Sequence, residues 1–187
     1  MPIVLARLDQ RLIHGQVLAS PALARDGING VILADDNISP ELRRIYDSGM
    51  EAADVGFAKG RHYVKPSLLP ALLREKDTPD SRFLVLFRDP KSVLVAVTAG
   101  LGLESLNLGN YATLSPDPVV LCSCLKLGPS ELEDLNLLSR LVPLLYFGSL
   151  EYSSETSRAY KPPGTANTEK TEKPKKSKRY AGAENNG

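Results

Sequence analysis

The chain has 187 residues, of which 42% are hydrophobic and 24% are charged, and its formal net charge is +1. This composition suits one sizeable hydrophobic core, and a single domain is the expectation at this length. The sequence contains no uninterrupted run of the roughly 18 apolar residues that a membrane span needs, and its start lacks the basic segment of a secretory signal, so we expect a cytoplasmic protein.

Six short apolar runs are predicted to be β-strands. Most of them lack the regular polar alternation of a half-exposed strand, which is typical of strands covered on both faces in a parallel sheet. The runs span residues 3–8, 30–35, 83–87, 105–109, 119–125 and 143–147.

Segments of helical character separate these runs, at residues 15–25, 39–53, 65–76, 89–100 and 128–141. Ser39 is predicted to be the N-cap of the second helix, with Pro40 at its first position, and Ser130 and Glu133 form a capping pattern in the last. The alternation of strand and helix predicts an α/β fold, with an open, mostly parallel, doubly wound sheet that carries helices on both faces.

The last part of the chain has a different composition. Residues 161–187 carry seven Lys or Arg and three Glu, with many Pro, Gly, Thr and Asn and few large apolar side chains. Such a segment cannot bury enough surface to offset its ordering entropy. We therefore divide the chain into an α/β domain, residues 1–150, and a Pro/Lys-rich tail, residues 151–187, that is predicted to be disordered. Because no aromatic residues interleave the basic run, we expect no nucleic-acid partner.

The two cysteines, Cys122 and Cys124, fall in an apolar segment that is predicted to be a strand. A C-x-C pair without further cysteines or a nearby histidine is a poor zinc site, so packing thiols are the favoured interpretation. No metal or cofactor is predicted anywhere in the chain.

The segment RLDQRLIHGQV, residues 7–17, places ionisable side chains between the first strand and the first helix. Ligands of open α/β sheets bind beyond the carboxyl ends of the strands, where this loop should lie. It matches neither G-x-x-x-x-G-K-S/T nor G-x-G-x-x-G, which argues against nucleotide binding through those motifs. Two further polar segments, residues 34–37 and 107–113, follow other strands and are expected at the same edge.

The residues of this loop suit phosphoryl chemistry on His14. Arg11 can hold phosphoryl oxygens with a guanidinium fork, and Asp9 can accept one imidazole N–H and leave the other nitrogen free as a nucleophile. Gly15 and Gln16 open the next helix, where backbone N–H groups favour an anion. A loop histidine is more often simply solvated, and Asp9 with Arg11 could be an ion pair. For His62 the sequence supports only the ordinary interpretation, a solvated side chain.

The same segment closely resembles the active-site loop of the enzyme IIB component of the mannose/fructose/sorbose family of the bacterial phosphoenolpyruvate-dependent sugar phosphotransferase system. The similarity continues in VILADDNIS and in FLVLFRDPKSVLVAVTAGLGLESLNLGNY, and it covers roughly residues 1–140. It implies that His14 is the phosphoacceptor and Arg11 a phosphoryl-binding residue. Asp9, Gly15 and Gln16 would shape the loop, and Asp35 and Asn110 would line the same edge.

The resemblance also implies partners. A phosphohistidine on an enzyme IIA component would donate the phosphoryl group, and a sugar held by membrane IIC and IID components would receive it, with peripheral association at the inner membrane through IIC and IID. The alternative is a regulatory or interaction protein that keeps the IIB-like fold without a link to sugar transport. Self-association and the identity of the sugar stay open.

Overall fold

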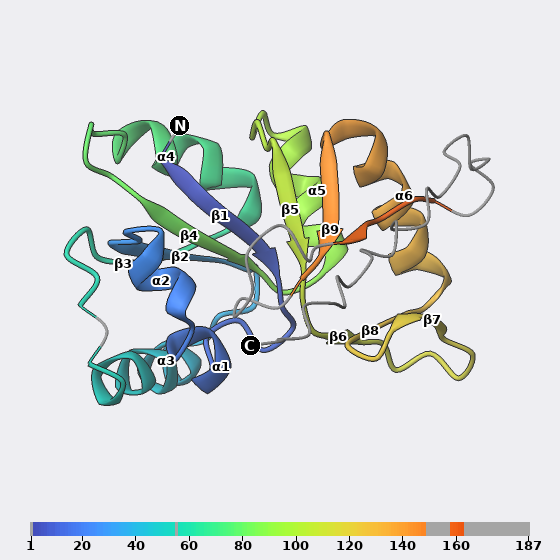
Figure 1. Ribbon diagram of the computed structural model, residues 1–187, viewed down its shortest axis with the longest axis horizontal. Coiled ribbons are helices and arrows are strands. Elements are labelled where there is room, and N and C mark those ends of the chain that lie inside the picture. The colour runs from blue at the N-terminus through green and yellow to red at the C-terminus, as the bar shows by residue number, and fades with distance from the viewer. Residues whose placement is uncertain (1, 55, 149–157, 163–187) are drawn as a thin grey trace, which may run out of the picture.

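The computed structural model describes residues 2–54, 56–148 and 158–162. Its central sheet contains β1 (Ile3–Leu8), β2 (Gly30–Ala34), β3 (Arg61–Val64), β4 (Phe83–Phe87), β5 (Ser105–Leu108), β9 (Leu144–Phe147) and β10 (Arg158–Ala159). The strand order is β10-β9-β5-β1-β4-β2-β3 (Figure 1). Neighbouring strands pair in parallel except β10, which is antiparallel to β9. The predicted open, mostly parallel sheet is confirmed.

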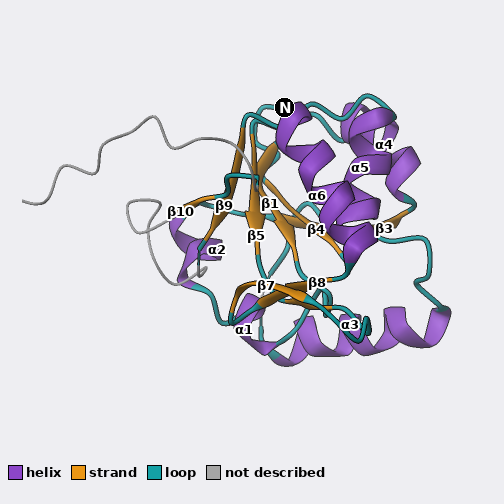
Figure 2. Cartoon of the chain, turned by 90° about the vertical axis from the view of Figure 1, so that its right-hand side faces the viewer, coloured by secondary structure: helices purple, strands orange, loops and turns teal. Residues whose placement is uncertain are grey.

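Helices cover both faces of this sheet (Figure 2). The helices are α1 (Gly15–Leu18), α2 (Pro21–Arg25), α3 (Pro40–Ala52), α4 (Leu69–Glu75), α5 (Pro90–Thr98) and α6 (Pro129–Leu141), and a 3₁₀ turn, η1 (Pro66–Leu68), precedes α4. Apolar side chains of α1, α2 and α3 belong to one buried cluster, and those of α4, α5 and α6 belong to another. The sheet separates the two clusters.

Strand β4 shows how one short sequence serves both clusters. Val85 and Phe87 point into the cluster under α4, α5 and α6, whereas Leu84 and Leu86 point into the cluster under α1, α2 and α3. Each of these side chains is fully buried. Because side chains alternate along a strand, a strand with helices on both faces needs an apolar residue at every position. This requirement explains why residues 83–87 form a continuous apolar run.

The predicted strand at residues 119–125 is confirmed only for its first four residues. The structure has a hairpin there, with β7 (Val119–Cys122) and β8 (Leu125–Leu127) joined by a two-residue turn at Ser123 and Cys124. With β6 (Tyr111–Ala112) these strands form a second sheet in the order β6-β8-β7. The turn contains none of the Gly, Pro, Asn or Asp residues that usually mark a hairpin, so the apolar run conceals it.

The predicted helix over residues 15–25 is interrupted. It ends at Leu18 and restarts at Pro21, because the residue before a proline avoids the helical region and Ser20 is extended, with φ −69° and ψ 126°. The Ser20 hydroxyl accepts a hydrogen bond from the Ala22 N–H at 3.2 Å and so caps α2. The predicted Ser39 cap of α3 is confirmed by its hydrogen bond from the Leu42 N–H.

Two further details differ from the sequence-based expectation. Helix α6 has Gly128 rather than Ser130 as its N-cap, because Pro129 occupies the first helical position. Strand β3, at the sheet edge, has four half-buried residues and was not predicted. Its RHYV sequence lacks the apolar run that marks the central strands.

Part of the segment beyond residue 150 packs against the sheet. Tyr160 is 8% exposed, its backbone N–H donates to the Leu145 carbonyl at 2.7 Å, and its hydroxyl donates to Asn136 Oδ1 at 2.7 Å. Residues 149–157 and 163–187 lie outside the described residues, so the domain boundary and the disorder of the tail stay predictions. Of the helices in the described part of the chain, none combines the length and the apolar character needed to cross a membrane.

Candidate functional site

The loop between β1 and α1 turns sharply at the carboxyl edge of the sheet. The Asp9 carbonyl accepts a hydrogen bond from the Leu12 N–H at 2.8 Å, and Leu12 has a left-handed backbone with φ +53°. Its fully buried side chain anchors the loop in the core. The carbonyl of His14 then accepts hydrogen bonds from the first turn of α1, so His14 is the N-cap residue. Helix α1 has only four residues, and its contribution to anion binding is correspondingly small.

The structure brings His14 and Asp9 together. His14 Nε2 lies 3.2 Å from Asp9 Oδ2, an arrangement in which a protonated Nε2 donates to the carboxylate. The side chain of His14 is 12% exposed, and that of Asp9 is completely buried. No hydrogen bond to Nδ1 comes from the described residues. A carboxylate at this distance from Nε2 favours the tautomer that carries its proton on Nε2, which leaves Nδ1 unprotonated.

Asp9 is the centre of a buried polar cluster. Its Oδ2 accepts hydrogen bonds from Arg7 Nε at 3.2 Å and Nη2 at 3.1 Å, and from Asn110 Nδ2 at 3.4 Å, while its Oδ1 accepts from the Arg11 backbone N–H at 3.3 Å. A buried carboxylate is stable only when it is paired and hydrogen-bonded. These contacts meet that requirement and hold the carboxylate in one orientation beside His14.

Sequence reasoning missed Arg7. This residue is 6% exposed, donates to the Asn107 side-chain oxygen, and lies 3.4 Å from the Gly148 carbonyl. A signal was available, because Arg7 and Asp9 are two residues apart at the end of a strand, and alternate residues of a strand share a face. An acid and a base placed in that way can form an ion pair.

Arg11 lies on the exposed side of the loop. Its side chain donates from Nη2 to Gln16 Oε1 at 3.1 Å, and both residues are exposed. Gly15, between His14 and Gln16, has open space around it. The guanidinium of Arg11 is thus accessible from solvent on the His14 loop, in contrast to the buried Arg7.

Asp35 lies at the same edge of the sheet, as predicted, but its oxygens are engaged. Arg88 Nε donates to Asp35 Oδ2, and the Asn37 N–H donates to Oδ1 at 3.1 Å. Arg88 also donates to the backbone carbonyl of Gln10 at 3.2 Å. Burial opposes the charge of Arg88, but the hydrogen bond and the attraction of Asp35 outweigh it and raise the pKa of the guanidinium. Arg88, which the sequence did not single out, connects Asp35 to the loop.

Asn110 joins the loop after β5 to the loop after β1. Its carbonyl accepts from the Gln10 N–H at 2.7 Å, and the Gln10 side chain exchanges hydrogen bonds with the backbone of Ala112 at 3.2 and 3.3 Å. The predicted convergence of polar strand ends is therefore present. His62 lies elsewhere, on β3, where its Nε2 is 3.0 Å from the Lys59 carbonyl and its ring packs edge-on against Phe83.

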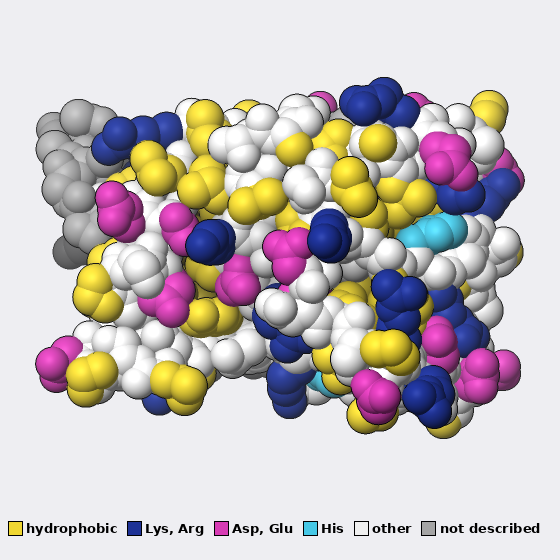
Figure 3. Space-filling view, turned by 180° about the vertical axis from the view of Figure 1, so that it is seen from behind, with side chains coloured by type: hydrophobic (Ala, Val, Ile, Leu, Met, Phe, Trp, Pro, Cys, Tyr) yellow, Lys and Arg dark blue, Asp and Glu magenta, His cyan; other side chains and the backbone are white. Residues whose placement is uncertain are grey.

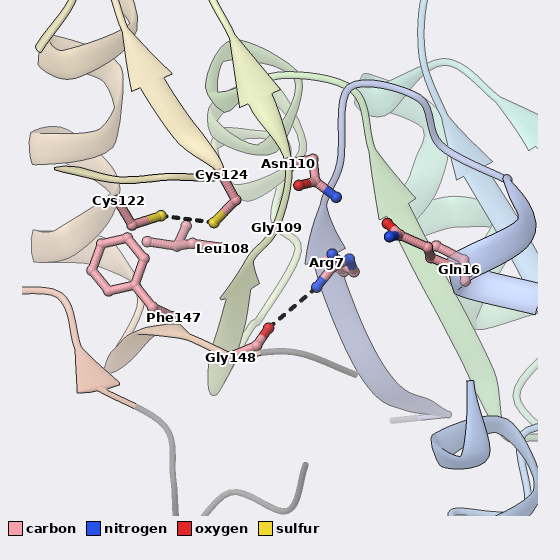
Figure 4. Close-up of a pocket in the computed structure, with 10 residues that line it drawn as sticks. Arg7, Gln16, Leu108, Gly109, Asn110, Cys122, Cys124, Phe147 and Gly148 are labelled. Carbon is pink, nitrogen blue, oxygen red and sulfur yellow. Dashed lines mark hydrogen bonds between the residues drawn. The ribbon is translucent and has the colours of Figure 1, made fainter. Parts of the chain in front are cut away.

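Two cavities border the loop. One, of about 420 Å³, is lined by Arg7, Gln16, Asn110, both cysteines and Phe147 (Figure 4). The other, of about 630 Å³, lies between α1 and α3, and its lining includes His14 itself. Among the described residues, no group of three or more His, Cys, Asp or Glu side chains is arranged to hold a metal ion.

This geometry defines a class of protein. An imidazole fixed by a buried carboxylate, with an exposed guanidinium on the same loop at the carboxyl edge of a doubly wound sheet, suits a carrier of phosphoryl groups. Residues 3–141 match the family model described as the PTS system sorbose subfamily IIB component, so the chain belongs to this family. It is a phosphotransferase component of a sugar phosphotransferase system.

Relatives and solved structures agree with this assignment. The chain is 29% identical over 146 residues to the sorbose-specific EIIB component of Klebsiella pneumoniae. The aligned region covers 75% of this chain and 83% of that protein. It is 27% identical over 117 residues to the fructose-specific EIIB component of Bacillus subtilis, covering 58% and 64%.

The fold is also that of solved IIB structures. The IIBSor domain of the sorbose permease from Klebsiella pneumoniae has a TM-score of 0.67 and 25% identity, covering 86% of this chain and 93% of that chain. The N-acetylgalactosamine-specific IIB component 1 from Escherichia coli has a TM-score of 0.70 and 22% identity, covering 86% and 99%.

Proposed function

We propose that His14 is a reversible phosphoryl carrier. It accepts the group from a phosphohistidine on an enzyme IIA component and passes it to a sugar taken up through membrane IIC and IID components. The observation that supports this role is the contact of His14 Nε2 with the buried Asp9 carboxylate, which leaves Nδ1 as the nucleophile. The site is proposed to act on the cytoplasmic side, with peripheral attachment to the inner membrane through IIC and IID.

The transfer requires little chemistry beyond alignment and charge stabilisation. The lone pair of His14 Nδ1 attacks phosphorus, the P–N bond of the donor breaks, and the donor imidazole leaves with that electron pair. Positive charge then develops on the His14 ring. The Asp9 carboxylate, held by Arg7 and Asn110, stabilises this charge through Nε2–H.

The incoming phosphoryl group needs a cation that is not already neutralised. Arg7 is paired with Asp9, and Arg88 with Asp35. Arg11 has an exposed guanidinium, and its described side-chain contact is with the neutral Gln16. We assign phosphoryl binding to Arg11, with Gln16 orienting its side chain and Gly15 leaving room above the loop.

Nucleic acid is not among the proposed partners. On the face shown in Figure 3, Lys and Arg side chains are interspersed with Asp and Glu. This face therefore lacks the grouped basic side chains of a nucleic-acid site.

The test is phosphorylation in a reconstituted system. The protein is incubated with phosphoenolpyruvate, the general phosphotransferase proteins and a candidate IIA component, and the protein mass is measured. The wild type should gain one phosphoryl group that is lost in acid and kept in alkali. His14→Gln should gain none, whereas His62→Gln, the matched control on β3, should behave like the wild type.

Two results would overturn the proposal. One is an acid-labile phosphate on His14→Gln, and the other is a wild type that accepts none from any phosphorylated IIA component tested. The second result would favour the alternative, a regulatory protein with this fold. Genes for IIA, IIC and IID components beside the gene for this chain would favour transport.

A further inference from the structure

The turn of the β7–β8 hairpin brings two thiols together. Cys122 ends β7, Cys124 is in the turn, and their Sγ atoms are 2.7 Å apart. This distance is well inside the ordinary van der Waals contact of two sulfur atoms. Figure 4 shows the two sulfur atoms pointing toward each other. A disulfide bond has an S–S length of about 2.05 Å, so the two sulfur atoms already lie within about 1 Å of bonding distance.

The local backbone explains this approach. The pairing of β7 with β8 shifts register between Val120 and Cys122, so that one extra residue lies in β7 directly before the turn. Such a bulge breaks the regular alternation of side chains and re-aims the residue that follows it. Cys122 and Leu125 are then paired, with only Ser123 and Cys124 between them.

The thiols are accessible and do not suit a metal. Both cysteines are free and half-buried, the intervening Ser123 is exposed, and both line the cavity of about 420 Å³. A closed zinc site needs four ligands, and the described residues supply no third His, Cys, Asp or Glu. Two adjacent thiols that open onto a cavity are instead suited to thiol–disulfide exchange.

We propose that Cys122 and Cys124 are a redox-active pair that forms an intramolecular disulfide by exchange with a low-molecular-weight disulfide. One protein thiolate attacks the small disulfide, forms a mixed disulfide and releases one small thiolate. The second protein thiolate then attacks the protein sulfur of the mixed disulfide and releases the other. The protein pair loses two electrons and two protons, and the small disulfide is reduced to two thiols. This inference does not depend on the proposed role of His14.

The environment of Cys124 disfavours its thiolate. Burial raises the pKa of the Cys124 thiol to about 11, the hydrogen bond to Cys122 adds to the rise, and the positive charge of Arg7 opposes it. A thiol with so high a pKa is a poor first nucleophile near neutral pH, because the thiolate is the reactive form. The two single Cys→Ser variants show which thiol attacks the small disulfide and which one resolves the mixed disulfide.

The experiment uses the full chain and oxidised glutathione. After incubation, remaining thiols are alkylated and the intact mass is measured. The wild type should become a monomer without alkyl groups, lighter by two hydrogen atoms, and dithiothreitol should restore two alkylatable thiols. Cys124→Ser should accumulate a mixed disulfide with one glutathione at a level at least about tenfold above the wild type, because the intramolecular resolving step is absent.

Cys122→Ser is the matched variant, and it should likewise accumulate a mixed disulfide with one glutathione, because it too lacks the partner thiol. Three results would overturn the proposal. These are two alkylatable thiols in the wild type throughout, a wild type carrying two glutathione groups, and oxidation that yields only disulfide-linked dimers. Circular dichroism of the reduced proteins checks that both variants are folded before they are compared.

Discussion

The chain at Gly109 lies directly against the guanidinium of Arg7. A Cβ atom at this position would overlap Arg7 Cζ and Nη2 and the Leu8 carbonyl oxygen. The Gly109 N–H donates to that same carbonyl at 2.9 Å, so the backbone after β5 is held close to β1. Glycine is thus required here by lack of space, because a side chain at this position would displace Arg7.

Gly109→Ala should therefore displace Arg7 and disturb the Asp9–His14 contact. Overpacking of this kind costs about 1–3 kcal/mol of unfolding free energy, which urea denaturation would measure. Phosphoryl acceptance should fall as well. Gly49→Ala is the control, because Gly49 lies inside helix α3 with open space around its Cα. That change should stabilise the protein by about 0.5–1 kcal/mol. Equal unfolding free energies of the two variants would show that position 109 has room for a side chain.

Arg88→Ala should loosen the loop between β1 and α1. It removes the hydrogen bond to the Gln10 carbonyl and leaves the buried Asp35 carboxylate without its cation. We expect phosphoryl acceptance by His14 to slow by roughly 10- to 100-fold, since small misplacements of reacting groups have effects of this size. Arg88→Lys keeps the charge but cannot make both contacts in the same geometry, so it should be intermediate.

A double-mutant cycle separates positioning from general loss of stability. Arg88→Ala should reduce the unfolding free energy by about 1–3 kcal/mol in the wild type and by less in an Asp35→Asn background, where no buried charge is left unpaired. Arg74→Ala, on the exposed side of α4, is the control for removal of an arginine. If Arg88→Ala lowered the unfolding free energy by the same amount in both backgrounds, Asp35 and Arg88 would not be coupled.

Arg11→Ala should affect phosphoryl transfer without affecting folding. The guanidinium is exposed, so its removal should change the unfolding free energy by less than about 0.5 kcal/mol. If it binds the phosphoryl oxygens, the transfer rate should fall by roughly one to three orders of magnitude, with Arg11→Lys intermediate. Arg25→Ala, which removes another exposed arginine, from α2, should leave the rate unchanged. A wild-type rate of phosphoryl transfer in Arg11→Ala would show that Arg11 is only a surface charge.

Two truncations test the end of the fold. Deletion of residues 163–187 should leave the melting temperature nearly unchanged, because their composition offers little apolar surface to bury. Deletion of residues 158–187 also removes Tyr160, and loss of a large buried aromatic side chain costs about 3 kcal/mol. It should lower the melting temperature clearly. A large drop after the shorter deletion would show that the tail is docked on the domain.

The sequence by itself determined the class of fold and the place of His14 in the loop after the first strand. Continuous apolar runs such as residues 83–87 indicate strands that are covered on both faces, and the structure confirms this for β4. The segment from Arg7 to Val17 placed His14, Asp9 and Arg11 in the loop after β1. Local patterns were sufficient for these predictions, because periodicity and loop position depend on neighbouring residues alone.

The long-range partners of this loop were decided only by tertiary structure. Asp9 meets Asn110 across about a hundred residues of sequence, and Gln10 meets Arg88 across 78. Contacts of this kind depend on strand order, which places β4 and β5 on either side of β1. No local pattern encodes that order. For the same reason the pairing of Arg88 with Asp35, and the close approach of Gly109 to Arg7, appear only when the strands are assembled.

The hairpin at residues 119–127 shows the same limit at shorter range. Its apolar sequence fits one strand as well as two, because the turn residues Ser123 and Cys124 carry no strong turn preference. The pairing of Tyr111 and Ala112 with β8 fixes the second strand from outside the segment. The position of the two thiols at a cavity is therefore a property of the assembled sheet, where distant backbone hydrogen bonds outweigh the weak local preferences of the sequence.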